Sequence, residues 1–481
     1  MWPKRALRTT LFVVGLLWGA IWLAPAQSAD AAGDPRLSSA YRFGRNGWIF
    51  VHLEGTASQI GYQHGYLLAP EIEEAFRAVR LHDTHTTGRD WSFFRTTAQQ
   101  ILWPHIDNEY RQELDGITEG LKARGVPMDV WDVVALNAME EIPGYYIPWL
   151  ERQTSHSAPV SRAPGNCSAF VATGSWTRDH QIVVAHNNWT EYLAGERWRV
   201  IFDIVPAAGY RMLMDGFPGI IASDDDFGVN SAGLIVTETT ITGFFGFDVE
   251  GKPEFMRARK ALQYADSIDA FVRIMNHGNN GGYANDWLLG DRKTGEIARF
   301  EQGLKRTRLW RTTNGYFEGA NFPSDRRIRE HETNFDIRNA SLSPNARRRR
   351  WQELLRKNKG KIDTAMAQKF LADHYDSFEK KEDAPSERSL CGHIDLSPRG
   401  FKGWLPAHYP GGASQNKVID SKMAADMTFL AYLGHACGND FNAQAFLSQH
   451  PEFKWQEPVL TDLKASGWTA FKAGDKPRDQ Q

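Results

Sequence analysis

Periodic and alternating hydrophobic positions divide the chain into a helical first third and a β-rich remainder. Residues 47–54 alternate like a strand, and Gly55 leads out of it. Helical patterns follow at 59–77, 91–102, 108–124 and 130–141. The segment 35–153 is therefore predicted to be a mainly helical N-terminal prefix.

Short β-rich runs separated by turn residues begin directly after residue 166. They occupy 167–173, 181–186, 197–205, 210–214, 233–241, 286–290 and 296–301, and a late apolar run at 427–435 is expected to rejoin the sheet. Helices are expected at 253–264, 267–276, 345–357 and 363–374. Many antiparallel strands followed by paired helices predict an α+β layered domain over 167–475, with helical additions towards its C-terminal end.

The segment 154–166 separates these two regions. It is rich in Ser, Pro and Ala (TSHSAPVSRAPG over 154–165), which is typical of an exposed linker. Cys167 stands at its end and opens the first strand of the β-rich region. A cysteine at such a junction becomes a chain end if the preceding bond breaks.

The first residues resemble an export signal. Lys4, Arg5 and Arg8 precede the almost wholly apolar stretch 11–24, and small residues up to Ala31 offer cleavage sites. We therefore expect a signal peptide over 1–29 and a periplasmic or secreted mature protein. A retained membrane anchor is the alternative, because the apolar run is near the lower limit for a span. No later segment is apolar enough to cross a bilayer.

Net charge argues against a nucleic-acid partner. The 481 residues carry a formal charge of −2, so no global basic field attracts polyanions. The run Arg347–Arg350 is local and is interpreted as a solvated helix face.

The chain has three cysteines, Cys167, Cys391 and Cys437. In an oxidising compartment Cys391 and Cys437 could form a disulfide, which would leave Cys167 as a free thiol. A buried, inert Cys167 is the plain alternative. The chemical alternative is a nucleophile, since a thiol has a pKa near ~8.5 and a free α-amine one near ~8. After cleavage of the Asn166–Cys167 bond, one residue would carry both nucleophile and base, as N-terminal threonine enzymes do.

Two polar segments could complete such a site. Residues 279–286 (NNGGYAND) enter an apolar strand, and Asn285 at its start could donate its amide to an oxyanion, although a turn residue is the simpler interpretation of any single Asn there. His186 and Trp189 lie in HNNW, on the strand expected to pair with 167–173.

These motifs together resemble the phospholipase B-like family of N-terminal-nucleophile (Ntn) hydrolases. The resemblance rests on runs in a fixed order: NCSA at 166–169, HNNW at 186–189, SDDDF at 223–227, SAGLIVTETT at 231–240, NDW at 285–287, GGA at 411–413 and KVID at 417–420. Glu54-Gly55 with GYQHG at 61–65 is similar to the related penicillin acyltransferase group.

The resemblance implies a four-layer αββα fold and autocatalytic maturation into two fragments that stay associated. It implies Cys167 as nucleophile, His186 and Trp189 as site residues, and Asn285 as oxyanion donor. It also implies a threonine within 238–240, for which we prefer Thr239 over Thr240. Penicillin acyltransferase and bile-salt hydrolase relatives carry Arg-Asn-x-Asp where this chain has HNNW, a departure that disfavours penicillin-like and bile-salt substrates.

The function expected is hydrolysis of a linear amide, an N-acyl amide or lipid-like acyl substrate, through a Cys167 thioester without cofactor or metal. Phospholipid ester hydrolysis or acyl transfer on the same site is the alternative, as is a binding protein on an inactive hydrolase scaffold. A serine lipase is disfavoured because Asn230-Ser231-Ala232-Gly233 lacks the first glycine of Gly-x-Ser-x-Gly. A metal hydrolase could use 224–226 (DDD) as oxygen ligands, but no HExxH spacing is present, and a strand-connecting turn is the preferred interpretation of these aspartates.

Overall fold

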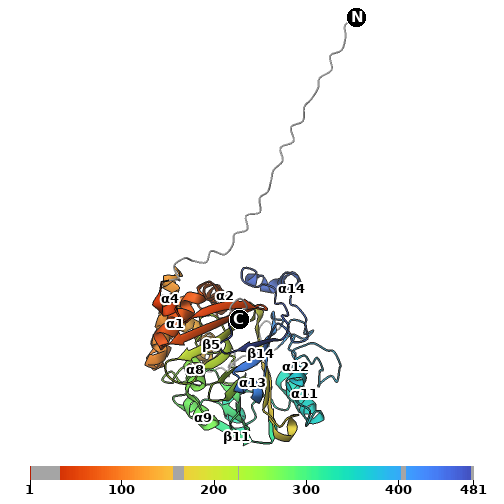
Figure 1. Ribbon diagram of the computed structural model, residues 1–481. Coiled ribbons are helices and arrows are strands. Elements are labelled where there is room, and N and C mark those ends of the chain that lie inside the picture. Colours follow the sequence, from red (N-terminus) through yellow and green to blue (C-terminus); the bar gives the residue numbers. More distant parts are fainter. Residues whose placement is uncertain (2–32, 155–166, 226, 402–407, 478–481) are drawn as a thin grey trace.

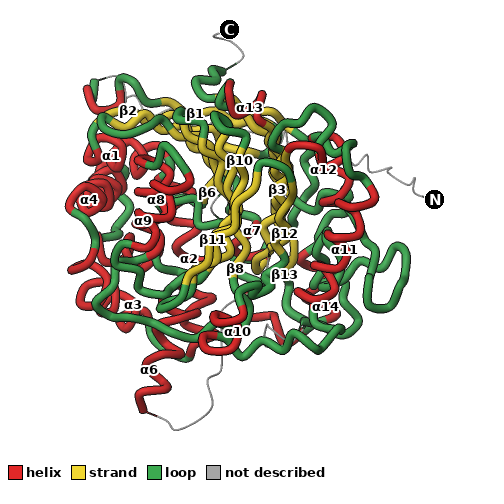
Figure 2. The backbone as a smooth tube through the Cα atoms, turned by 90° about the horizontal axis from the view of Figure 1, so that it is seen from below, coloured by secondary structure: helices red, strands yellow, loops and turns green. Residues whose placement is uncertain are grey.

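The computed structural model describes residues 1, 33–154, 167–225, 227–401 and 408–477. The expected signal peptide, apart from Met1, and the expected linker, apart from Thr154, lie outside the described residues. Two β-sheets and the helices around them confirm the α+β class (Figure 1, Figure 2). Among the described residues, no helix is both long and apolar enough to cross a membrane.

The larger sheet has nine strands, in the order β1-β2-β5-β6-β7-β8-β9-β10-β11. The strands are β1 Tyr41–Arg45, β2 Trp48–Gly55, β5 Val200–Pro206, β6 Met212–Gly216, β7 Gly228–Asn230, β8 Leu234–Thr240, β9 Asn285–Asp291, β10 Glu296–Gln302 and β11 Thr307–Thr312. β2 runs parallel to β5, and every other neighbouring pair is antiparallel. The N-terminal prefix thus contributes two strands to this sheet besides its helices.

The smaller sheet is antiparallel throughout, in the order β12-β3-β4-β13-β14-β15. Its strands are β3 Cys167–Thr173, β4 Val183–Glu191, β12 Gly315–Gly319, β13 Gly411–Asp420, β14 Thr428–Leu433 and β15 Thr469–Lys472. The hairpin expected between 167–173 and 181–186 is confirmed as β3–β4. β4 extends five residues past the expected end, to Glu191.

The two sheets pack face to face through a buried apolar layer. Phe50, Ile201 and Leu213 of the larger sheet meet Val171 and Val184 of the smaller one. Side chains alternate across a strand, so Phe170 and Ala172 of β3 point away from this layer and into a second cluster with Trp351 and Leu355. The interior between the sheets and the one outside the smaller sheet are therefore separate.

Helices lie on both sides of the sheet pair (Figure 2). The first group is α1 Ala57–Leu67, α2 Ala69–Thr87, α3 Trp91–Thr97, α4 Asn108–Ala123, α5 Val130–Asn137, α6 Ile147–Thr154, α8 Glu254–Tyr264 and α9 Ile268–Asn276. On the other side, α11 Ser343–Lys357 and α12 Thr364–Leu371 pack on the smaller sheet. Shorter helices are α7 Tyr192–Gly195, α10 Arg326–Glu332, α13 Ser421–Ala425 and α14 Ala443–Gln449.

Glycines explain how the first helix fits. A Cβ at Gly61 would lie 2.0 Å from Glu113 O, and one at Gly65 would lie 2.1 Å from Ile117 O. Both glycines therefore let the backbones of α1 and α4 touch. The helix expected over 59–77 breaks at Leu68 into α1 and α2, because Pro70 cannot donate an intrahelical hydrogen bond and begins a new helix.

Candidate active site

Cys167 lies at the start of β3, buried between the two sheets with 2% of its surface exposed. Its backbone N–H donates to Asn321 Oδ1 at 3.0 Å. Its Sγ lies 3.8 Å from both Asn188 Oδ1 on β4 and Glu238 Oε1 on β8. Both sheets thus supply groups to the thiol.

Arg347 of α11 holds the backbone of Cys167 in place. Its Nη1 donates to Cys167 O, and to Ser168 Oγ at 3.0 Å, while its Nη2 donates to Asn321 Oδ1 at 2.8 Å. Its guanidinium lies 4.3 Å from the centre of the Trp189 ring. The interpretation of 347–350 as a solvated helix face is therefore wrong for Arg347, which is fully buried. Burial lowers its pKa to about 9.

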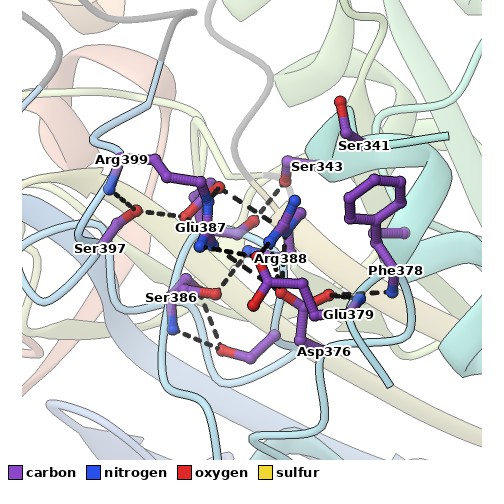
Figure 3. A network of polar contacts seen from close by, with 12 residues as sticks. Ser341, Ser343, Asp376, Phe378, Glu379, Ser386, Glu387, Arg388, Ser397 and Arg399 are labelled. Atoms are coloured by element: carbon purple, nitrogen blue, oxygen red, sulfur yellow. Dashed lines mark hydrogen bonds and ion pairs between the residues drawn. The ribbon is translucent and has the colours of Figure 1, made fainter. Parts of the chain in front are cut away.

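A polar network supports Arg347 from behind. Its Nε donates to Ser343 Oγ at 2.9 Å, and Ser343 Oγ donates to Glu387 O. Figure 3 shows Ser343 beside Glu387 and Arg388, in the loop segment 376–399. Arg388 Nε donates to Asp376 Oδ2 at 2.9 Å in the same network. The contacts of Arg347 with Cys167 are thus linked, through Ser343 and Glu387, to a buried set of ion pairs.

His186 shares the face of β4 that points at the thiol. The β3–β4 register pairs Cys167 with Asn188 and Ala169 with His186, so Asn188 and not His186 stands directly opposite Cys167. Ligand atoms of Cys167, His186 and Glu238 nevertheless lie within 4.8 Å of one another. Neither ring nitrogen of His186 has a hydrogen-bond partner among the described residues. Burial lowers the pKa of His186 to about 3, so the imidazole is neutral.

A buried ion-pair cluster lies behind His186. Lys417 of β13 binds Asp215 Oδ2 at 2.8 Å and also Asp225 Oδ2, and His186 Nδ1 lies 3.9 Å from that same Asp225 oxygen. Ser223 Oγ donates to both aspartates, at 3.0 and 2.7 Å. Asp224 and Asp225 of the DDD run lie in the connection between β6 and β7, as expected, and both are buried. Asp226 lies outside the described residues.

Glu238 is the carboxylate nearest to the thiol. Tyr283 Oη donates to its Oε1 at 3.4 Å. Asn285 begins β9, and in the amide orientation that satisfies both contacts its Nδ2 donates to Glu238 Oε2 at 2.8 Å and to Ala284 O at 3.1 Å. The Asn285 amide is thus engaged by Glu238. The Asn188 Nδ2, by contrast, has no hydrogen-bond partner within the described part of the chain.

A cavity of about 20 Å³ opens beside the sulfur, which is room for about one water molecule. Its walls include Cys167, Asn188, Trp189, Thr240 and Tyr283. Thr240, and not Thr239, lies at this wall, while a Cβ on Gly319 would meet Thr239 Cγ2 at 2.6 Å. Burial and the charge of Glu238 raise the pKa of the Cys167 thiol well above its ordinary value, whereas the backbone N–H of Trp189 lowers it.

The site therefore unites Cys167, His186, Trp189 and Asn285, all singled out from the sequence. Sequence reasoning missed Asn188, Glu238, Asn321 and Arg347 as separate contributors. Asn188 and Glu238 stand inside the motifs HNNW and TETT, so strand alternation offered a signal for them. No sequence motif pointed to Asn321. In the structure its backbone has a positive φ of 59°.

The other two cysteines are free thiols, Cys391 buried and Cys437 partly exposed. The disulfide expected between them is not formed in this structure.

Comparisons with known proteins agree with the motif series. A profile of the family described as Phospholipase B matches residues 86–470. The chain is 23% identical over 431 residues to Phospholipase B-like 1 of Homo sapiens, covering 78% of this chain and 74% of that protein. It is 26% identical over 445 residues to Phospholipase B of Crotalus adamanteus, covering 78% and 75%. Putative phospholipase B-like 2 of Rattus norvegicus is 31% identical over 151 residues, covering 27% and 24%.

Proposed function

Because this chain belongs to the phospholipase B family, we propose that it is a hydrolase that matures by cleaving its own Asn166–Cys167 bond and then uses Cys167 as an N-terminal nucleophile. The proposal includes the four-layer αββα Ntn arrangement, with helices outside two stacked sheets. It also includes export, with residues 1–29 as the signal and the mature enzyme in a periplasm or outside the cell. The prefix 35–153, the linker 154–166 and the catalytic region 167–475 are the expected units.

One observation supports the proposal most strongly: the groups around Cys167 bind both its backbone and its thiol. Asn321 Oδ1 accepts from the nitrogen that would become the α-amine, and Arg347 donates to the carbonyl of the same residue. The sulfur meanwhile faces a small cavity whose walls include Asn188, Trp189 and Thr240. A cysteine that only filled space would not require a buried guanidinium and an amide fixed on its main chain.

Maturation follows from this placement. The Cys167 sulfur attacks the Asn166 carbonyl carbon, the C–N bond breaks, and the thiol proton passes to the departing amine. Water then hydrolyses the resulting thioester, which frees the thiol and leaves a carboxyl group on Asn166. Because the pKa of the thiol is raised in the intact chain, a base must take its proton. Glu238, 3.8 Å from the sulfur, is the carboxylate placed for that step.

Turnover uses the new amine as the base. The α-amine accepts the thiol proton, the sulfur attacks the acyl carbon, and the protonated amine gives its proton to the leaving group. Water resolves the thioester. His186, which is neutral and lies 3.9 Å from Asp225, has a ring nitrogen within 4.8 Å of the sulfur. None of these steps requires a cofactor.

We propose that amide N–H groups beside the sulfur stabilise the oxyanion. Asn285 is the donor expected from the family resemblance, but its Nδ2 is engaged by Glu238. We therefore assign the oxyanion to Asn188 Nδ2 together with the Trp189 backbone N–H, and give Asn285 the task of orienting Glu238. Removing one such donor typically costs roughly 3–4 kcal/mol of transition-state stabilisation.

The substrate class we propose is a linear amide, an N-acyl amide or an amide-linked lipid. The names of the relatives, Phospholipase B and Phospholipase B-like 1, favour a phospholipid ester as the second candidate. Both would form the same Cys167 thioester, and acyl transfer differs only in the acceptor that resolves it.

The test compares Cys167→Ala, Cys167→Ser and Ser231→Ala with the wild type. Ser231 is exposed and is the serine of the lipase alternative, so it serves as the matched control. We expect two fragments on denaturing gels for the wild type and Ser231→Ala, slow cleavage for Cys167→Ser, and one inactive band for Cys167→Ala. Panels of acyl amides and phospholipids then identify the substrate. A Cys167→Ala protein that is cleaved and active would refute the proposal, and an uncleaved wild type at acidic and neutral pH would favour the binding-protein alternative.

A further inference from the structure

Two cysteines and two histidines converge beyond the wall of the active site. His374 follows α12, Cys391 and His393 stand in the loop before β13, and Cys437 follows β14. Their sulfur and ring-nitrogen atoms all lie within 4.8 Å of one another. Cys437 Sγ is 3.4 Å from His393 Nε2. Two connecting segments, one between α12 and β13 and one after β14, thus bring four donors to one point.

The 3.4 Å between Cys437 Sγ and His393 Nε2 falls in the range of a tetrahedral zinc site. With Zn–S near ~2.3 Å and Zn–N near ~2.05 Å, ligand atoms of a regular tetrahedron lie about 3.3–3.8 Å apart. We propose that His374, Cys391, His393 and Cys437 form a structural zinc site. Four protein ligands leave no open position, so the ion would stabilise the fold and take no part in hydrolysis.

A carboxylate hydrogen-bonds to His374, and a second carboxylate lies near His393 without a hydrogen bond to it. His374 Nδ1 lies 3.0 Å from Asp383 Oδ1, which leaves its Nε2 for the ion; that nitrogen has no partner among the described residues. His393 directs Nε2 at Cys437, while its Nδ1 lies 3.9 Å from Asp395 Oδ1. A carboxylate on the far nitrogen of each histidine is the usual outer shell of a zinc site.

The four residues of the cluster differ in how far they are buried. Cys391 and His393 are buried, while Cys437 is partly exposed and the His374 side chain is 15% exposed. The ring of His435 stacks on His393 with centres 3.8 Å apart, and its Nε2 lies 2.8 Å from Tyr192 Oη. His435 is thus engaged elsewhere, and an ion can enter from the side of His374 and Cys437.

The cluster also connects to the active site. Gly392, between two of the ligands, packs against Trp189 so tightly that a Cβ there would lie 2.1 Å from Trp189 Cε2. Asn187 Nδ2 donates to Leu390 O at 2.9 Å, which ties the same loop to β4. The ion-pair network of Figure 3 holds the preceding part of this loop. Zinc would complete that support and fix the wall formed by Trp189.

The sequence carries a signal for this site. Cys391-Gly392-His393 is a C-x-H pair in which both end residues are proposed ligands, whereas His435-Ala436-Cys437 contributes only Cys437. From the sequence we expected no metal, because the chain has no HExxH spacing and the aspartates at 224–226 were assigned to a strand-connecting turn. The free thiols that replace the expected disulfide are the form that can bind an ion.

The test uses the full chain, reduced with a phosphine under native conditions and freed of metal by a chelator. Titration with Co²⁺ is expected to give one equivalent bound, with the visible absorption of tetrahedral cobalt and a thiolate charge-transfer band, both lost on adding Zn²⁺. Cys391→Ser/Cys437→Ser should lose this spectrum, whereas Cys167→Ser, which removes the other thiol, should keep it.

A milder variant guards against loss of the fold. Asp383 is 89% exposed, so Asp383→Asn should fold normally and bind Co²⁺ about tenfold more weakly. Asp426→Asn, at another exposed aspartate, should bind like the wild type. A folded, reduced wild type that binds no Co²⁺, or a double-cysteine variant with an unchanged spectrum, would overturn the proposal. Both readouts are independent of hydrolysis, so they separate this inference from the proposed function.

Discussion

Replacing Arg347 by lysine tests whether its side chain positions the nucleophile. The substitution keeps a positive charge but replaces a planar fork by a single ammonium group. In the structure the three guanidinium nitrogens donate hydrogen bonds to four acceptors: Cys167 O, Ser168 Oγ, Asn321 Oδ1 and Ser343 Oγ. The single ammonium group of a lysine of similar length can donate to Cys167 O or to Ser343 Oγ, but not to both.

The size of the effect follows from the acceptors left behind. Each buried acceptor without a donor costs roughly 1–3 kcal/mol, so loss of two predicts destabilisation of about 2–6 kcal/mol. The same contacts fix the carbonyl and, through Asn321, the nitrogen of Cys167. If about 1.4 kcal/mol of that positioning is lost in the transition state, cleavage slows about tenfold.

The assay follows fragment appearance on denaturing gels and thermal unfolding by circular dichroism. Arg349→Lys is the matched control, because Arg349 is exposed and contacts only Ala340 O, at 2.8 Å, among the hydrogen bonds found. It should stay within about 0.5 kcal/mol of the wild type. A native-like spectrum for Arg347→Lys would show that slow cleavage is not loss of fold. Cleavage at the wild-type rate with unchanged stability would refute the positioning argument.

Three other perturbations test separate parts of the account. Asn188→Ala should lower kcat/KM roughly 10²–10³-fold. An unchanged kcat/KM would contradict the assignment of Asn188 as oxyanion donor and favour Asn285. Lys417→Met leaves two buried carboxylates without their cation and should cost about 3–5 kcal/mol in urea unfolding, so an equally stable variant would contradict the ion-pair cluster. Burial and the charge of Glu191 raise the pKa of Glu140 to about 8. The hydrogen bond that His82 donates to Asp83, together with nearby negative charges, outweighs burial and raises the pKa of His82 to about 9. Both groups hold protons more tightly when folded, so Tm should fall as pH rises from about 5 to 9, and Glu140→Gln should flatten this fall; a Tm rising with pH would contradict it.

The sequence pattern located most elements because burial follows the strand and helix periods. β3 begins and ends at the residues expected, and α8, α9 and α11 lie within two residues of their expected bounds. β13 was missed because GGASQNKVID is polar yet almost wholly buried. Its Lys417 is neutralised by Asp215 of β6 and by Asp225 of the connection after β6, and no local pattern reveals such partners.

The candidate site was predictable where residues share a motif and not where distant segments meet. Cys167, His186 and Trp189 lie on one hairpin, so short-range pairing placed them together. Arg347 stands in a run of four arginines that differ only in direction on the helix, and only packing against β3 buries the first of them. Register also decided that Asn188 faces Cys167, because a shift of one residue reverses every side chain.

The central claim is that Cys167 becomes the first residue of the catalytic fragment. N-terminal sequencing of the large C-terminal fragment, from material purified with full activity, tests it most directly. The account predicts a sequence that begins Cys-Ser-Ala-Phe-Val, read from residue 167. Active enzyme in which Cys167 is still preceded by Asn166 would contradict it.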